Sequence, residues 1–349
     1  MQIKDIGEQG LLRIIQKFCP SDIIGDDGAI LTTPNDRALV ITTDMLVEEV
    51  HFSDRTTSAQ DTGWRAVAAN LSDLAAMGAT PLGITVALSV TPETPVNWVE
   101  ELYQGMTACL KPYNTPIIGG DIVRSRLRAI SITALGYSHP DNTIRRNTAK
   151  PGEVILVTGI HGASRAGLEL LLNPELGETL TPIEKQILIR AHQRPYPRLD
   201  VLPHLWDICQ SQPLNQEGQG GLKPPLLRGA RGDLTGMDSS DGLADAIIQI
   251  CHASGIGARI EREKIPIPSS VLKLVTAEKA LDWALYGGED FELVLCLPPE
   301  IGEKLVAKIG KPAAIVGITT DNPSILLVDQ KSLYPDEALT QNKGFQHFA

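Results

Sequence analysis

Aspartate recurs in this 349-residue sequence at places where a carboxylate contrasts with its neighbours. Asp73 stands inside the run Asn70–Ala79, in which most residues are small or apolar and have helical spacing. A lone carboxylate in such a run either faces water or requires a positive partner, because burying it alone is costly. Four further clusters place Asp beside Gly, Thr or Ser, and they occupy positions 25–28, 42–44, 119–121 and 238–242.

These residue types are the ones that hard cations bind. Carboxylate and hydroxyl oxygens, held on backbone turns that glycine permits, are the ligands that Mg²⁺ prefers. One Asp-Gly pair is ordinary turn chemistry. Five such clusters together indicate a site for several metal ions that bridge phosphate oxygens.

Other charged residues suggest how the rest of such a site is built. Arg124 and Arg146 carry guanidinium groups that suit phosphate, although either is equally consistent with a solvated surface charge. Glu289 and Asp290 follow two glycines and precede an apolar strand, where a carboxylate binds a ligand or caps the turn. His51 follows Asp44 closely, and a lone histidine there is either functional or structural.

Several classes of protein are disfavoured. The sequence contains no GxxxxGK[ST] loop, no GxGxxG after a strand, and no HExxH or Cys/His zinc spacing. A formal net charge of -11 argues against nucleic acid or an anionic membrane as the main partner. No apolar run approaches the ~20 residues that span a bilayer, and the first residues lack a signal-peptide pattern. Five scattered cysteines without a CxxC pair favour the cytoplasm.

The elements that must position these groups alternate between strand and helix, which indicates an α/β or α+β fold. Length predicts two domains, and the turn signal Lys150–Glu153 places their boundary so that they comprise residues 1–149 and 150–349. The Gln-, Gly- and Pro-rich segment 211–232 is predicted to be a flexible insertion. The main expected helices are 7–18, 61–77, 95–110, 164–172, 182–193, 200–209, 242–253 and 300–309, and the main expected strands are 38–43, 82–90, 115–118, 129–137, 154–159, 291–297, 314–318 and 325–328.

The motifs, taken together and in order, resemble those of the thiamine-monophosphate kinase family within the aminoimidazole ribonucleotide synthetase superfamily. The resemblance covers nearly the whole chain. It rests on residues 25–27, 43–52, 70–79, 119–121, 240–243 and 287–293, of which Asn70–Ala79 and Gly287–Leu293 are the most diagnostic.

The resemblance implies a two-domain kinase fold and ATP-dependent phosphorylation of thiamine monophosphate to thiamine diphosphate, the last step of that biosynthesis. It implies several Mg²⁺ ions, with ATP as co-substrate. It also implies a homodimer in which the N-terminal domains pair through their sheets.

Site residues follow from the same motifs. The resemblance implies metal ligation by Asp26, Thr42, Thr43, Asp44, Asp73, Asp121, Asp238 and Asp241, with Asp44, Asp73 and Asp121 central to catalysis. It implies ATP contacts from Tyr103, Gly120, Asp121, Arg146 and Ser240, and substrate contacts from His51, Glu289 and Phe345.

The sequence also departs from the family pattern. Glu49 stands where the family usually has glycine before Val50 and His51, which puts the conformation of that loop in question. Two other functions stay open at this point. A selenophosphate or aminoimidazole ribonucleotide synthetase would share the scaffold, although Cys19 lacks the Gly-rich setting of the former. A non-enzymatic nucleotide-binding protein would not need so many carboxylates.

Overall fold

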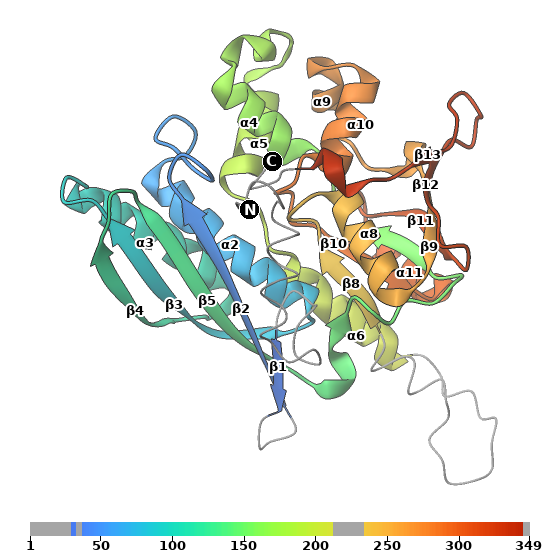
Figure 1. Cartoon of the computed structure of the whole chain (residues 1–349), viewed down its shortest axis with the longest axis horizontal. Coiled ribbons are helices and arrows are strands. Elements are labelled where there is room, and N and C mark those ends of the chain that lie inside the picture. The colour runs from blue at the N-terminus through green and yellow to red at the C-terminus, as the bar shows by residue number, and fades with distance from the viewer. Residues whose placement is uncertain (1–28, 33–36, 212–233, 345–349) are drawn as a thin grey trace, which may run out of the picture.

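The computed structural model describes residues 29–32, 37–211 and 234–344 (Figure 1). Asp26, Phe345, the expected helix 7–18 and nearly all of the expected insertion 211–232 lie outside these residues. The strands are β1 (Ala29–Thr32), β2 (Ala38–Val47), β3 (Thr80–Val90), β4 (Ile117–Arg124), β5 (Ala129–Ser138), β6 (Ile144–Arg145), β7 (Val154–Val157), β8 (Leu234–Asp238), β9 (Gly257–Glu261), β10 (Leu293–Leu297), β11 (Ala314–Thr320), β12 (Ile325–Val328) and β13 (Glu337–Ala338). The helices are α2 (Ala59–Ala76), α3 (Val96–Leu110), α4 (Ala163–Leu172), α5 (Pro182–Gln193), α6 (Val201–Ser211), α8 (Leu243–Ser254), α9 (Ser269–Leu274), α10 (Ala277–Tyr286) and α11 (Pro299–Ile309).

The first sheet has the strand order β1-β2-β5-β3-β4, and every pair is antiparallel except β3 with β4. Helices α2 and α3 cover one face of it (Figure 1). The other face, called the outer face below, carries the side chains of Thr43, Met45 and Thr133 and is covered by no helix of the described residues. Side chains alternate between the two faces along each strand, so burial alternates too.

Helix α2 is the element on which both halves of the molecule pack. It contacts β2, β3 and β5 of the first sheet and β8 of the second. Fifteen of its 18 residues are buried, and most of them are small, which lets neighbouring backbones approach closely. Ser58 caps its N-terminus by accepting a hydrogen bond from the Asp61 backbone N–H at 3.1 Å.

The second sheet has the order β13-β12-β9-β11-β7-β10-β8-β6. Its central strand β10 is buried on both faces, as a continuous apolar run predicts. Leu293 and Leu295 pack into the core that contains α2, whereas Val294 and Cys296 pack against α8 on the opposite face. The carboxyl end of the neighbouring strand β8 is Asp238, so the sheet delivers this carboxylate next to α2.

The expectation of a mixed α/β fold with two sheets is confirmed. One local interpretation was wrong. The expected strand 115–118 ends too early, because Gly119, Gly120 and Asp121 lie inside β4, which pairs with β3 as far as Arg124. The sequence interpretation also missed α9, α10, β6, β8 and β13. In the part of the chain that is described, no helix combines the length and apolar character needed to cross a bilayer.

Candidate active site

A cavity of about 950 Å³ opens between the two halves of the molecule. Its walls come from five segments: β2 with the loop that follows it, α2, α4 with α5, residues 240–241, and residues 287–291. The predicted residues that line it are Thr43, Asp44, His51, Asp73, Ser240, Asp241 and Glu289. Its volume suits a small-molecule ligand.

Three carboxylates form the acidic centre: Asp238 is buried, and Asp44 and Asp73 are half-buried and line the cavity. Burial raises the pKa of Asp73 well above its usual value, and neighbouring Asp44 and Asp238 raise it further. Burial, with the charge of Asp238, raises the pKa of Asp44 to about 6. Burial also raises the pKa of Asp238, which is wholly inaccessible to solvent. The three groups come from β2, α2 and β8, and their mutual repulsion is the electrostatic signature of a cation site.

Hydroxyl groups satisfy part of this negative charge. Thr42 donates a hydrogen bond to Asp73. Ser72 donates to Asp238 Oδ2 at 2.6 Å, and Ser240 donates to Asp238 Oδ1 at 2.9 Å. These bonds explain why Asp238 is held rigidly between α2 and β8.

The strand alternation separates Thr43 from Thr42. Thr42 and Asp44 point toward α2, whereas the Thr43 hydroxyl donates to the Ile132 carbonyl at 2.9 Å. Its oxygen also accepts a bond from Thr133 at 3.2 Å. The structure therefore does not bring the Thr43 side chain together with Asp73.

Four further predicted residues do not line the cavity within the described chain. Gly120 and Asp121 lie in the edge strand β4, where the Asp121 side chain is exposed and accepts a bond from the Ile122 backbone N–H at 2.9 Å. Tyr103 packs on α3 against the core, and burial raises its pKa. Arg146 follows β6, donates to Gln249 at 2.6 Å, and its charge lowers the pKa of Asp238.

The expected substrate residues His51 and Glu289 both line the cavity. His51 Nδ1 accepts a bond from the Val47 backbone N–H at 3.0 Å. Glu289 pairs with Arg65 of α2 and lies 3.4 Å from His192 Nδ1 of α5. Burial opposes ionisation of Glu289, but Arg65 and His192 outweigh it and lower the pKa to about 2, so this carboxylate is charged at neutral pH.

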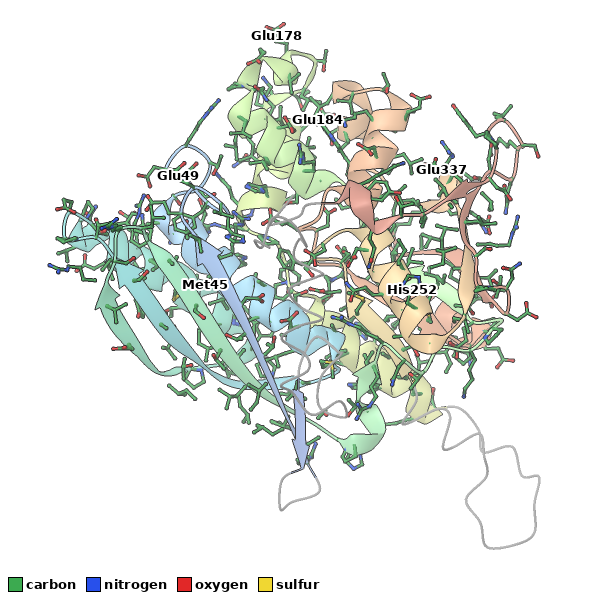
Figure 2. The ribbon with its side chains drawn as sticks, in the orientation of Figure 1. Met45, Glu49, Glu178, Glu184, His252 and Glu337 are labelled. Atoms are coloured by element: carbon green, nitrogen blue, oxygen red, sulfur yellow. The ribbon has the colours of Figure 1, made fainter. Side chains whose placement is uncertain are left out.

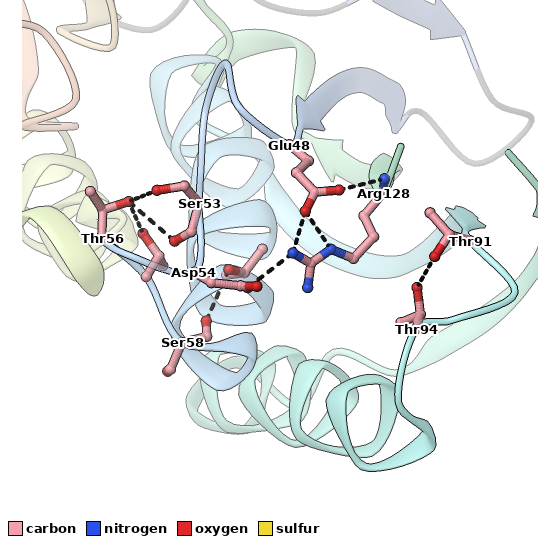
Figure 3. Close-up of polar contacts among 10 residues, drawn as sticks. Glu48, Ser53, Asp54, Thr56, Ser58, Thr91, Thr94 and Arg128 are labelled. Atoms are coloured by element: carbon pink, nitrogen blue, oxygen red, sulfur yellow. Dashed lines mark hydrogen bonds and ion pairs between the residues drawn. The ribbon is translucent and has the colours of Figure 1, made fainter. Parts of the chain in front are cut away.

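The loop that carries His51 is fastened at both ends (Figure 3). Glu48 accepts bonds from the Arg128 backbone N–H at 3.0 Å and from Arg128 Nε at 2.9 Å. The same guanidinium donates to Asp54 at 2.9 Å and lies 4.7 Å from the centre of the Trp98 ring. The Arg128 bond lowers the pKa of Glu48, so both partners are charged.

Glu49 adopts a left-handed backbone conformation, with φ of 65° (Figure 2 labels the residue in the loop after β2). Its backbone N–H donates to the Phe52 carbonyl at 2.8 Å, which holds the tight turn. A residue with a Cβ is strained there, and glycine is not. The turn therefore favours the glycine that the family usually has, and Glu49 adopts the same conformation under strain.

We expect Glu49→Gly to raise the free energy of unfolding by about 1 kcal/mol, because it removes left-handed strain. Glu49→Ala is the matched control, since it removes the carboxylate but keeps the Cβ and should gain nothing. Urea denaturation of the two variants measures the difference. Equal stabilities of the two variants would contradict the strain argument.

The donor set fits Mg²⁺ in its chemistry. It consists of carboxylate and hydroxyl oxygens, and the repulsion among Asp44, Asp73 and Asp238 is what a divalent cation offsets. Among the described residues, no three His, Cys, Asp or Glu groups are arranged to hold an ion by themselves.

Some residues at the cavity had no place in the sequence interpretation. They are Arg65 and Ser72 on α2, His192 on α5 and Arg165 on α4. The signal for Arg65 was available, because it is a charge in the same Ala-rich segment that made Asp73 conspicuous. His192 has no comparable signal in its own segment.

Two family models match the chain. The model described as "AIR synthase related protein, N-terminal domain" matches residues 25–138. The model described as "AIR synthase related protein, C-terminal domain" matches residues 230–329. The first match includes β2, α2 and β4, and the second includes Asp238 and Glu289.

Individual proteins are similar over the full length. A curated thiamine-monophosphate kinase of Synechococcus elongatus is 46% identical, covering 99% of this chain and 98% of its own. That of Prochlorococcus marinus is 37% identical, covering 85% and 84%. A solved structure described as "AaThiL complexed with AMPPCP and TMP" has a TM-score of 0.77 at 28% identity and covers 99% of both chains.

Proposed function

The chain belongs to the thiamine-monophosphate kinases of the AIR synthase related family, and we propose that its cleft transfers the γ-phosphoryl group of ATP to thiamine monophosphate. The products are thiamine diphosphate and ADP, and this reaction is the last step of thiamine diphosphate biosynthesis. One observation carries the proposal. A single cavity is lined both by Asp44 and Asp73 of the acidic centre and by His51 and Glu289.

The reaction does not require a strong general acid or base from the protein. The nucleophile is a phosphate oxygen of thiamine monophosphate, which is already anionic at neutral pH, so no activated Ser, Cys or His is needed. The obstacle is repulsion between two polyanions in an acidic site. Mg²⁺ held by Asp44, Asp73, Asp238 and Asp241 would supply the positive charge that phosphoryl transfer requires.

The chain's own residues then orient the reactants. Asp73 is fixed by Thr42, and Asp238 by Ser72 and Ser240, so the carboxylates need not reorganise during the reaction. We assign metal ligation also to Asp26, Thr43 and Asp121, and ATP contacts to Tyr103, Gly120, Asp121, Arg146 and Ser240. Asp44, Asp73 and Asp121 are assigned to the catalytic centre.

The substrate side of the cleft suits a cation. The thiazolium ring of thiamine carries a positive charge, and the ionised Glu289 supplies the opposite charge in a partly buried setting. His51 lines the same cavity. Phe345 completes the proposed substrate contacts.

The decisive test is ADP release by the purified chain with Mg²⁺ and ATP. Thiamine monophosphate, free thiamine and a no-acceptor sample are compared. We expect ADP only with thiamine monophosphate, together with an equal amount of thiamine diphosphate. ADP formed equally with free thiamine, or with none of the three, would overturn the proposal and favour another member of the superfamily or a nucleotide-binding protein.

We also propose that two copies pair through the outer face of the first sheet. This face exposes Met45 (54%), and the edge strand β4 exposes Ile118, Ile122 and Val123 (56%, 61% and 51%). Figure 2 shows Met45 on the open side of β2. Exposed apolar side chains that gather on one sheet mark an interface.

We expect light scattering to give twice the mass of one chain, and Val123→Glu to halve it, since it places a charge in the interface. Val96→Glu changes a residue that is 76% exposed at the start of α3, and it should leave the mass unchanged. A single-chain mass for the unaltered protein would refute the pairing.

The remaining assignments are also proposals. We place the enzyme in the cytoplasm, with no nucleic acid or membrane partner, and its described cysteines are buried. We divide the chain into domains 1–149 and 150–349. The strands of the first sheet end at Ser138, and β7 of the second begins at Val154, which supports a division in this region. The short strand β6 already belongs to the second sheet.

A further inference from the structure

Arg65 is a buried cation in the middle of the helix that joins the two halves of the molecule. Its side chain is 3% exposed. Its two terminal nitrogens contact different walls of the cavity. Nη1 donates to the His51 carbonyl oxygen at 2.9 Å, and Nη2 pairs with the carboxylate of Glu289. One planar guanidinium therefore connects the loop after β2 with the segment that precedes β10.

The two groups that Arg65 connects are both held in a constrained backbone. Glu289 has φ of 58° and its N–H donates to the Ser240 carbonyl at 2.6 Å. The His51 loop contains the strained Glu49. A side chain on strained backbone keeps its position only when its surroundings fix it. For Glu289 those surroundings are the guanidinium of Arg65 and the ring of His192.

The charges around Glu289 favour this arrangement. Burial lowers the pKa of His192, and so does the charge of Arg65, although Glu289 works against them. A neutral His192 adds no charge but can donate from Nδ1, which also lies 3.3 Å from the Ser164 hydroxyl. Arg65 therefore supplies the permanent positive charge next to Glu289, which is one-third exposed toward the cavity.

We propose that Arg65 is the positioning residue of the substrate side: it sets the place of Glu289 relative to the His51 loop and thereby the affinity for thiamine monophosphate. The inference rests on the proposed function. Arg65 touches neither ATP nor the acidic centre in this scheme, so its loss acts on substrate binding rather than on the chemical step. Arg65→Lys keeps the charge but cannot span both walls, because an ammonium lacks the planar fork of a guanidinium.

Steady-state kinetics of Arg65→Met test the proposal. We expect KM for thiamine monophosphate to rise about tenfold or more, as the loss of a charged hydrogen bond predicts. We expect kcat and KM for ATP to change less than about threefold. Arg65→Lys should recover part of the loss. A fall in kcat with an unchanged KM for thiamine monophosphate would overturn the proposal.

A double-variant cycle separates positioning from a general structural role. If Arg65 acts through Glu289, Arg65→Met combined with Glu289→Gln should raise KM no more than Glu289→Gln alone, within about twofold. If the double variant instead raises KM by the product of the two single factors, the mechanism is overturned. Should Arg65→Met not fold, the same comparison is made with Arg65→Lys.

Arg194→Met is the matched control. Arg194 pairs with Asp61 in the first turn of α2, so its loss also removes an ion pair between α2 and the end of α5. We expect lower stability with an unchanged KM for thiamine monophosphate. A rise in KM equal to that of Arg65→Met would overturn the proposal. If the unaltered chain forms no ADP with thiamine monophosphate, the proposed function itself fails. That failure is seen in the unaltered chain alone and is therefore distinct from any effect of an Arg65 variant.

Discussion

The Asp73→Asn variant is expected to lose about a thousandfold or more in kcat while keeping its fold. Asp73 is the member of the acidic centre whose charge interacts with all the others, since Asp44, Asp238 and Asp241 each raise its pKa after burial does so. An amide of the same shape can still accept the Thr42 hydrogen bond. It cannot provide the negative charge that holds a divalent cation against the phosphates.

The same substitution should not destabilise the chain, because the carboxylate is buried among like charges. We expect the Tm of Asp73→Asn in metal-free buffer to equal or exceed that of the unaltered protein, since a functional charge cluster costs stability. Asp61→Asn is the control. It removes a carboxylate from the first turn of the same helix, where Asp61 pairs with Arg194, and should leave kcat unchanged. A well-folded Asp73→Asn protein with normal kcat would remove Asp73 from the centre of the mechanism.

The position of Asp73 could be predicted because its signal is local. A carboxylate in a small, apolar helix is expensive unless other groups compensate. In the structure the Thr42 hydroxyl compensates in part, whereas Asp44 and Asp238 add like charge. The alternation of β2 also implies that Thr42 and Asp44 share a face and that Thr43 does not. Thr43, which the motif also names as a ligand, therefore points its side chain to the other face.

The partner of Glu289 could not be predicted in the same way. Arg65 lies 224 residues earlier in the chain, and no spacing rule connects the two positions. Only the packing of α2 between the two halves brings them together. Residues that act across such an interface become visible only when the fold is known.

The glycines of β4 misled the sequence interpretation for a different reason. Two consecutive glycines are typical of a turn. In the structure, a Cβ at Gly120 would overlap the backbone carbonyl of Val86 in the adjacent parallel strand. Here glycine allows two strands to approach closely and does not form a turn. A sequence shows the same glycines in either case.

The close approach of α2 to α3 fixes the position of α2. We expect a substitution at this contact to have the largest effect on the stability of the protein. Gly63 of α2 and Gly105 of α3 sit where the two helices cross. A Cβ on Gly63 would overlap the carbonyl of Leu102, and one on Gly105 would overlap the carbonyl of Gln60. Because both obstacles are backbone atoms, the helices can accept a side chain only by moving apart.

We expect Gly63→Val to lower the free energy of unfolding by about 3 kcal/mol, the upper part of the range for overpacked cores. Gly119→Ala is the control, because its Cβ would meet only Thr85 Cγ2 at 3.9 Å. Urea denaturation measures both. The folded fraction of Gly63→Val should also bind substrates poorly, since a displaced α2 carries Arg65 and Asp73 with it. If Gly63→Val is as stable as the unaltered protein, the crossing of α2 and α3 does not fix the position of α2, on which both halves of the site depend.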